Sequence, residues 1–328
     1  MKKVTTFLSL LILVLLAACG SEEGEQGEGN QKDTMYTTVY PLEFVAQQIV
    51  GDKVEVESIL PAGSDAHTYE PTTKEMVQMA EGKAFIYTKD EFEPYAATIA
   101  ETLNEEGVTT LPVAKGLEEV GHGEEDTHEE DHAEEESAAD DHAGHNHSVG
   151  GEDPHIWLDP MVMTKVAESL KEEFIAMYPE KEETFLQNTE TLKEQLTELD
   201  EQMATTIQEA DTKEVVVSHA AYGYWEEAYG LKQIAISGLS STNEPSQKEL
   251  EHVIETAKEH GLDYVLFEKN VSPKAAEVVQ EEIGAEPLYL HNLATRTEDE
   301  IDNDENYFDL MQKNIEVLEQ ALYEEDPA

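Results

Sequence analysis

The sequence predicts an α/β protein in which one long rigid helix joins two (β/α) lobes, each built on a parallel sheet. In both halves of the chain, short runs rich in β-branched and aromatic residues alternate with longer runs of helical period. Between the halves, residues 180–210 have leucines and charges at helical spacing and contain neither glycine nor proline. The length of 328 residues suits two lobes of about 130 to 150 residues each better than one core.

The first half contains four expected strands, at 34–40, 53–60, 84–88 and 108–114. The helix expected after the second strand has a clear start, because Thr72 and Glu75 have the spacing of a capping box. Strands that alternate with helices favour a parallel sheet. We therefore expect residues 34–179 to form the N-terminal lobe.

The second half repeats this rhythm, with strands expected at 214–218, 232–237, 263–268 and 286–290. Its helix boundaries are sharper. Ser246 and Glu249 form a capping box, and Gly261 ends the helix that they begin. The pair Ser272 and Pro273 supplies an N-cap and a first-turn proline for the next helix. We expect 211–328 to form the C-terminal lobe, with 180–210 as the connecting helix.

The N-terminal residues have the pattern of an export signal. Lys2 and Lys3 precede an apolar run of signal-peptide length, which ends at Cys19, the only cysteine in the chain. This pattern predicts a signal peptide at 1–18, lipidation of Cys19 and an acidic flexible tether at 19–33. An ordinary signal peptide with a chance cysteine is the alternative. We expect no disulfide, and a lipid anchor on the extracytoplasmic face of the bacterial cell membrane.

The charge of the chain is strongly acidic. Lysine and arginine total 20 against 74 aspartates and glutamates, for a formal net charge of −54, and Arg296 is the only arginine. Such a surface repels phosphate backbones, which excludes nucleic acid as a partner. Adaptation to high salt or high pH explains this general acidity better than a specific role does.

Residues 119–152 interrupt the rhythm of strands and helices. This segment has almost no apolar residues, so it is expected to be a disordered loop. It also holds six of the twelve histidines, interleaved with acids, and these predict an accessory, low-affinity collector of divalent metal ions. A solvated acidic insertion is the alternative. The six are His122, His128, His132, His142, His145 and His147.

Three other histidines are expected to lie at the same edge of the fold. His67 and His219 follow strands at their carboxyl ends, and His155 lies in a loop just before a helix that Asp159 and Pro160 begin. Ligands of open parallel sheets bind outside the carboxyl ends of the strands. Each histidine alone is better explained as structural, but three in equivalent positions predict a metal site.

Four segments resemble, in order, the signatures of the zinc-type substrate-binding lipoproteins of bacterial ABC metal-uptake transporters, a family that includes streptococcal-type zinc-binding adhesion lipoproteins. The segments are GSDAHTYEP at 63–71, DPHIWLDP at 153–160, SHAAYGYW at 218–225 and EPS at 244–246. The resemblance implies two (β/α) lobes with metal bound in the interlobe cleft. It also implies that His67, His155 and His219 are the ligands.

The residue types favour Zn²⁺ as the transported ligand. Three neutral imidazoles suit zinc, whereas manganese sites prefer carboxylate oxygens. Related manganese binders resemble this sequence but have a glutamate where His219 stands. Manganese or another divalent metal is the alternative cargo.

The fourth ligand is where the resemblance fails. Many relatives have an aspartate or glutamate shortly after the last strand, where this chain has Ala294. Four candidates remain open: His291, Glu268, a histidine of the 119–152 loop, or water. An open fourth position bound by water would exchange metal faster.

We expect the protein to be a monomer that captures Zn²⁺ and delivers it to an ABC permease. The ATPase of that transporter supplies the energy. A surface adhesin is an alternative of another class. A zinc hydrolase is a remote alternative. Glu70 and Glu268 could nominally act as the general base, but neither lies in a known hydrolase motif such as H-E-x-x-H, and no nucleophile elbow or phosphate loop occurs. We therefore predict that the protein is not an enzyme.

Overall fold

The computed structural model describes residues 33–117, 152–240, 244–269 and 274–323. All elements below lie in the unit Thr34–Ala328. The predicted signal peptide, Cys19, the six histidines of the 119–152 segment and the pair Ser272 and Pro273 lie outside the described residues.

The N-terminal lobe contains a four-stranded parallel sheet in the order β2-β1-β3-β4. Of its two central strands, β3 is buried throughout, and β1 alternates between half-buried and buried residues. The strands are β1 (Thr34–Thr37), β2 (Glu55–Ser58), β3 (Ala84–Tyr87) and β4 (Thr109–Pro112). The helices among them are α2 (Tyr40–Val50), α3 (Thr73–Ala80) and α4 (Pro94–Glu105), with a short 3₁₀ turn η1 (Gly51–Lys53).

The C-terminal lobe repeats this topology, because its parallel sheet has the order β6-β5-β7-β8. The strands are β5 (Glu214–His219), β6 (Lys232–Ser237), β7 (Tyr264–Glu268) and β8 (Glu286–Leu290). The helices are α7 (Gly223–Tyr229), α8 (Gln247–His260), α9 (Lys274–Ile283), α10 (Glu298–Asp302) and α11 (Tyr307–Leu322). The two parallel sheets confirm the predicted fold class.

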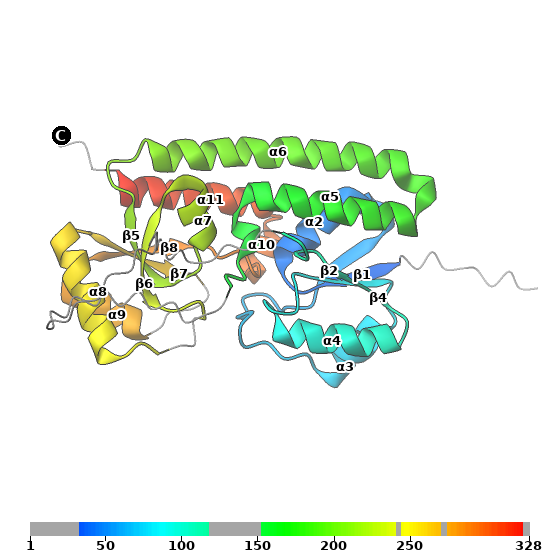
Figure 1. Ribbon diagram of the computed structural model, residues 1–328, viewed down its shortest axis with the longest axis horizontal. Coiled ribbons are helices and arrows are strands. Elements are labelled where there is room, and N and C mark those ends of the chain that lie inside the picture. Colours follow the sequence, from blue (N-terminus) through cyan, green and yellow to red (C-terminus); the bar gives the residue numbers. More distant parts are fainter. Residues whose placement is uncertain (1–32, 118–151, 241–243, 270–273, 324–328) are drawn as a thin grey trace, which may run out of the picture. The chain divides into compact units, whose positions relative to one another are not determined.

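A long helix joins the lobes, as predicted. A short 3₁₀ turn, η2 (Ile156–Leu158), precedes α5 (Pro160–Met177), and a second, η3 (Pro179–Lys181), follows it. The long helix α6 then runs from Glu182 to Gln208, over 27 residues. It lies alongside α5 and α2 of the first lobe and alongside α11 of the second (Figure 1). Its buried stripe has helical spacing and includes Phe185, Leu192, Leu196, Leu199, Met203 and Ile207.

The apolar core explains how the lobes are held. One cluster lies under α3 and α4 and a second under α8 and α9, each on one face of one sheet. The largest cluster runs through α2, α5, α6 and α11 and contains residues of both lobes, such as Phe44 and Tyr307, whose rings stack 5.6 Å apart. The two lobes therefore share one continuous apolar core, which α6 covers.

The helix boundaries follow the caps read from the sequence. The capping boxes of Thr72 with Glu75 and of Ser246 with Glu249 are both formed, and Gly261 ends α8 in the left-handed conformation at φ 66°. The run 34–40 is a strand only as far as Thr37, because the proline after Tyr40 fixes the backbone for the first turn of α2. Among the described residues, none of the helices combines the length and the apolar character that crossing a membrane requires.

Candidate metal centre

The structure brings together the three histidines that the sequence singled out. Each of His67, His155 and His219 offers one ring nitrogen, and these atoms lie within 4.8 Å of one another. The ring centroids are 5.4 Å apart for His67 and His155, 5.9 Å for His67 and His219, and 5.3 Å for His155 and His219. His155 and His219 are each 1% exposed, whereas His67 is exposed. The arrangement is a triangle of imidazoles with one open side.

His67 lies in the loop that follows β2. Its backbone N–H donates to Oδ1 of Asp65 at 2.9 Å, which fixes a tight turn just before the imidazole. The loop begins at Gly63, whose φ of 69° is unfavourable for other residues. The N–H of Gly63 donates to the carbonyl of Arg296 in the other lobe at 2.9 Å. Both lobes therefore determine where His67 lies.

His155 is fixed by the carboxylate two residues before it. Oδ1 of Asp153 accepts from the backbone N–H of His155 at 2.9 Å and lies 2.7 Å from its Nδ1. A carboxylate that accepts the Nδ1 proton sets the tautomer and leaves Nε2 as the metal-facing nitrogen. Asp159 then caps α5 by accepting from Met161 and Val162. The DPH sequence and the following cap together orient this candidate ligand.

His219 is the last residue of β5 and lies beside Glu268, the last residue of the neighbouring strand β7. Its Nδ1 is 2.6 Å from Oε1 of Glu268, which is an ion-pair distance, although the two atoms lack the alignment of a hydrogen bond. Nε2 of His219 is buried and has no hydrogen-bond partner among the described residues. Buried polar atoms normally have a partner, and a metal ion held by the triangle would supply one.

The electrostatics of the triangle favour a neutral imidazole at His67. Although His67 is exposed by surface area, the protein atoms packed around its ring desolvate it and lower its pKa to about 4, and the neighbouring His155 and His219 act in the same direction. Burial alone would raise the pKa of Glu268, but His219, His155 and His67 together hold it below its ordinary value. A carboxylate that stays ionised close to three imidazoles is a suitable environment for a divalent cation.

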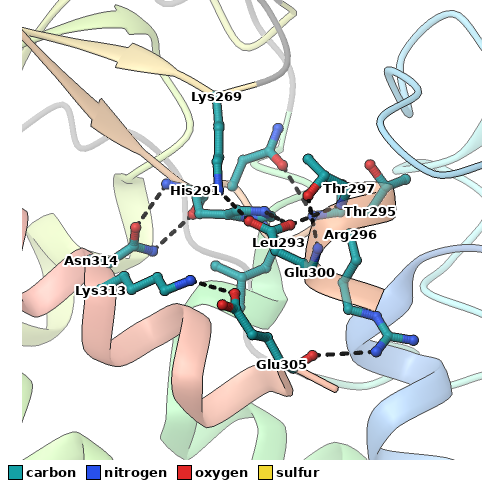
Figure 2. A network of polar contacts seen from close by, with 12 residues as sticks. Lys269, His291, Leu293, Thr295, Arg296, Thr297, Glu300, Glu305, Lys313 and Asn314 are labelled. Atoms are coloured by element: carbon teal, nitrogen blue, oxygen red, sulfur yellow. Dashed lines mark hydrogen bonds and ion pairs between the residues drawn. The ribbon is translucent and has the colours of Figure 1, made fainter. Parts of the chain in front are cut away.

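The two residues named as possible fourth ligands have other partners. Oε2 of Glu268 accepts from Nδ2 of Asn292 at 3.0 Å, so both of its oxygens are engaged. Nδ1 of His291 accepts from the N–H of Leu293 at 2.9 Å, and Nε2 lies 3.1 Å from Oε2 of Glu300 (Figure 2). The structure does not bring His291 to the three histidines, and it places Glu268 behind His219.

The sequence interpretation missed two roles at the site. Asp153 was not recognised as the partner of His155, although its position two residues earlier in the DPH segment was visible. Glu268 was considered only as a ligand or a base, and its contact with His219 depends on β5 and β7 being neighbours. The first signal was available in the sequence, whereas the second required the strand order.

A cavity elsewhere in the C-terminal lobe contains none of these histidines. It has a volume of about 670 Å³, and residues such as Thr212, Asp263 and Glu286 line it near the amino ends of β5, β7 and β8. In open parallel sheets the functional edge is the carboxyl one. We therefore take the histidine triangle, and not this cavity, as the candidate site.

Comparisons with known proteins agree with this architecture. The sequence model of the family described as "ZnuA: Zinc-uptake complex component A periplasmic" matches residues 35–321. The zinc-binding lipoprotein AdcA of Streptococcus pneumoniae is 34% identical over 328 residues, which is all of this chain and 62% of AdcA. The chain therefore spans less than two thirds of that relative.

Two further matches cover nearly whole proteins or domains. The high-affinity zinc uptake system protein ZnuA of Bacillus subtilis is 31% identical over 318 residues, 96% of each chain. The crystal structure of the Zn(II)-bound ZnuA-like domain of S. pneumoniae AdcA superposes with a TM-score of 0.71 at 31% identity, covering 89% of this chain and 100% of that domain. Proteins of this family bind substrates and are not enzymes. With its fold, its histidine triangle and a family match over nearly the whole described chain, this protein belongs to the ZnuA family of zinc-uptake components.

Proposed function

We propose that this protein is the extracytoplasmic zinc-binding component of an ABC importer, which captures Zn²⁺ and delivers it to a membrane permease. One observation carries the proposal: His67, His155 and His219 offer ring nitrogens within 4.8 Å of one another, and they come from both lobes. Three imidazoles are a common ligand set for zinc, whereas manganese favours oxygen ligands. The names of the two zinc-binding relatives agree with this cargo.

In the proposed centre the two buried histidines bind through Nε2, because Asp153 and Glu268 occupy the other side of each ring. His67 completes the set from the exposed side, where an arriving ion meets it first. The fourth position is left to water, because Glu268 and His291 have other partners. A water-filled position allows faster exchange, which suits a protein that must release its cargo.

Protonation sets the working range of the proposed site. Only neutral imidazole binds a metal ion, so a histidine that is easily protonated loses affinity in mild acid. The pKa of His67, lowered to about 4 by burial and by the other two rings, keeps this ligand ready well below neutral pH. For His67, the loss of affinity is therefore expected below the ordinary histidine range near pH 6.5.

The remaining parts of the proposal concern the rest of the chain. We infer that 1–18 is a signal peptide, that Cys19 carries a lipid anchor after the tether 19–33, and that the histidines of the 119–152 segment collect metal at low affinity. We also infer a monomer with the divisions 34–179, 180–210 and 211–328. The sequence patterns support these inferences, and the word lipoprotein in the name of AdcA agrees with the anchor.

A zinc and manganese competition titration tests the proposal, with bound metal counted by mass spectrometry. The full chain, a chain lacking residues 121–148 and a His67→Ala variant of each are compared, and His252→Ala on exposed α8 is the matched control. We expect one tightly held zinc that survives the deletion and excess manganese, is weakened strongly by His67→Ala and is unaffected by His252→Ala. If binding disappears with residues 121–148 and His67→Ala has no effect, the site is wrong, and a loop-based metal buffer or an adhesin is favoured.

A further inference from the structure

We propose that Asn292 is a positioning residue for the metal centre, because it connects the partner of His219 in one lobe with the neighbour of His155 in the other. The proposal rests on the proposed function, since it concerns the same three imidazoles. Asn292 belongs to a five-residue stretch, Asn292–Arg296, that leaves β8 and passes along the N-terminal lobe. We call this stretch the crossing segment.

The side chain of Asn292 acts on His219 through Glu268. Its Nδ2 donates to Oε2 of Glu268 at 3.0 Å, and Oε1 of that carboxylate lies 2.6 Å from Nδ1 of His219. Glu268 is 2% exposed, so this carboxylate has little contact with water, and the hydrogen bond from the amide helps to hold its orientation. The Oδ1 of Asn292 accepts from the N–H of Ala294 at 3.1 Å. The two contacts together fix which end of the amide faces Glu268.

The backbone of Asn292 reaches the surroundings of His155. Nε1 of Trp157 donates to the carbonyl of Asn292 at 2.7 Å across 135 positions of sequence. The Trp157 ring is 3% exposed and contacts the His155 ring edge to face, with centroids 5.4 Å apart. One residue therefore contacts the group that supports His219 and the ring that packs against His155.

The rest of the crossing segment holds the loop of His67. Oγ1 of Thr295 donates to the carbonyl of Ser64 at 3.1 Å, and the carbonyl of Arg296 accepts from Gly63 at 2.9 Å. The carbonyl of Ala294 also accepts from the N–H of Tyr40 at 2.9 Å. The immediate surroundings of all three imidazoles thus contact this one short stretch.

The start of the crossing segment is held firmly in the C-terminal lobe. Figure 2 shows His291 between Asn314 of α11, which exchanges two hydrogen bonds with its backbone, and Glu300 of α10. Leu293 has a φ of 62°, which is rare for a residue other than glycine, and it is completely buried. Such a conformation persists where the surroundings determine it, and such residues concentrate at functional sites. His291, considered as a ligand from sequence, here supports the backbone of Leu293.

A purely structural role for Asn292 makes a different prediction from a positioning role. In the structural case, the contact from Oδ1 to Ala294 alone matters, and a side chain that keeps this acceptor would behave as the parent. Asn292→Asp keeps the acceptor but replaces the donor to Glu268 with a second carboxylate. In a positioning role, this single change turns Glu268 away from His219 and disturbs the metal centre.

A charge-conserving pair of changes completes the test. In Asn292→Asp with Glu268→Gln, the side-chain hydrogen bond can form again with its direction reversed, and the total charge stays that of the parent. The oxygen of the new amide can still accept from Nδ1 of His219. If Asn292 acts through Glu268, the double variant recovers zinc affinity that Asn292→Asp loses. The matched control is Asn188→Asp on α6, because Nδ2 of Asn188 donates to the carbonyl of Ile49 on α2, away from the centre.

The experiment uses the full chain and two probes, Zn²⁺ in competition with a coloured chelator and Co²⁺ by its visible absorption, which reports ligand geometry. We expect Asn292→Asp to weaken zinc binding about 10- to 100-fold and to change the Co²⁺ spectrum, as outer partners of metal-binding histidines do. The double variant should recover a large part of the zinc affinity and of the parent's Co²⁺ spectrum. Asn188→Asp should have the affinity and the spectrum of the parent. Far-ultraviolet circular dichroism and thermal melting confirm that each variant folds.

The failures of the two proposals can be told apart. If the parent binds one zinc that His67→Ala weakens, but Asn292→Asp has the parent's affinity and Co²⁺ spectrum, the positioning role is wrong and the proposed function stands. If Asn292→Asp does not fold, Asn292→Ser replaces it, because a hydroxyl can accept from Ala294 but is too short to reach Glu268. If the parent holds no zinc that depends on His67, the proposed function itself fails.

Discussion

Nδ1 of His155 lies 2.7 Å from Oδ1 of Asp153, and both side chains are buried, at 1% and 0% exposed. The same oxygen accepts from the backbone N–H of His155 at 2.9 Å. Asp153 therefore holds the ring, the tautomer and the turn at once. In the proposed centre, this carboxylate supports metal binding without contacting the ion.

The first prediction is that Asp153→Asn weakens zinc binding about 10- to 100-fold while leaving one site per chain, because the amide is a poorer acceptor for the Nδ1 proton. Competition with a chelator measures the affinity. Asp52→Asn, at an exposed position in η1, is the control and should have the parent's affinity. Equal affinity for Asp153→Asn and the parent would show that His155 needs no carboxylate behind it.

The second prediction concerns pH. The pKa of His67 is lowered to about 4 in the folded protein by burial and the two neighbouring rings, whereas an unfolded histidine titrates near 6.5. Between these values the unfolded chain binds more protons, so the metal-free protein loses stability through His67 as pH falls from 6.5 to 4. In the His67→Ala variant, stability should therefore decrease less as the pH falls from 6.5 to 4. Melting temperatures of metal-free parent and His67→Ala across this range test it, and parallel curves would contradict it.

The third prediction concerns the connecting helix. Leu196 is completely buried on α6, and Leu186 on the same helix is 46% exposed. Leu196→Ala should cost about 2 to 5 kcal/mol of unfolding free energy, because it leaves a cavity in the core shared by the lobes. Leu186→Ala, the same change on the same helix, should cost less than about 1 kcal/mol. Urea unfolding followed by circular dichroism measures both, and similar losses would mean that the buried stripe is assigned wrongly.

The fourth prediction concerns Arg296, the only arginine. Its guanidinium lies 4.2 Å from the centroid of Tyr40, 3.4 Å from Oε1 of Glu43 and 3.3 Å from the carbonyl of Glu305. A lysine cannot stack and bridge in this way, so Arg296→Lys should lower stability by on the order of 1 kcal/mol.

The control for Arg296 is Lys313→Ala, which removes an exposed ion pair with Glu305 and should change stability by less than about 1 kcal/mol. Chemical unfolding of both variants gives the comparison. A stability of Arg296→Lys equal to that of the parent would mean that charge alone holds this contact between the lobes.

The fifth prediction concerns movement. The largest apolar cluster includes α2, α5, α6 and α11 and runs through both lobes, so wide opening would expose part of it to water. We therefore expect zinc to cause loop shifts and small tilts only. X-ray scattering of the metal-free and zinc-loaded chain should give the same radius of gyration within error. A clear decrease on zinc binding would indicate lobe closure instead.

Local features of the sequence predicted most of the elements and singled out the three histidines. Alternating β-rich and helical runs, capping boxes at Thr72 and Ser246 and the unbroken period of 180–210 are local features, and local hydrogen bonds and apolar spacing express them directly. The end of β1 was misplaced, because the choice between strand and helix near Tyr40 depends on the proline that follows. The position of His67 and His219 after strands, and of His155 just before a helix, predicted that they meet at one edge.

The contacts behind and between those histidines depend on how distant parts of the chain pack together. Glu268 reaches His219 because β7 pairs with β5, and Asn292 reaches Glu268 and Trp157 because the crossing segment passes between the lobes. These contacts join residues far apart in the chain. No periodicity or spacing along the sequence encodes them, because strand order and packing of the shared core bring them together. The same reason explains why His291, a plausible ligand by sequence, supports the backbone of Leu293 instead.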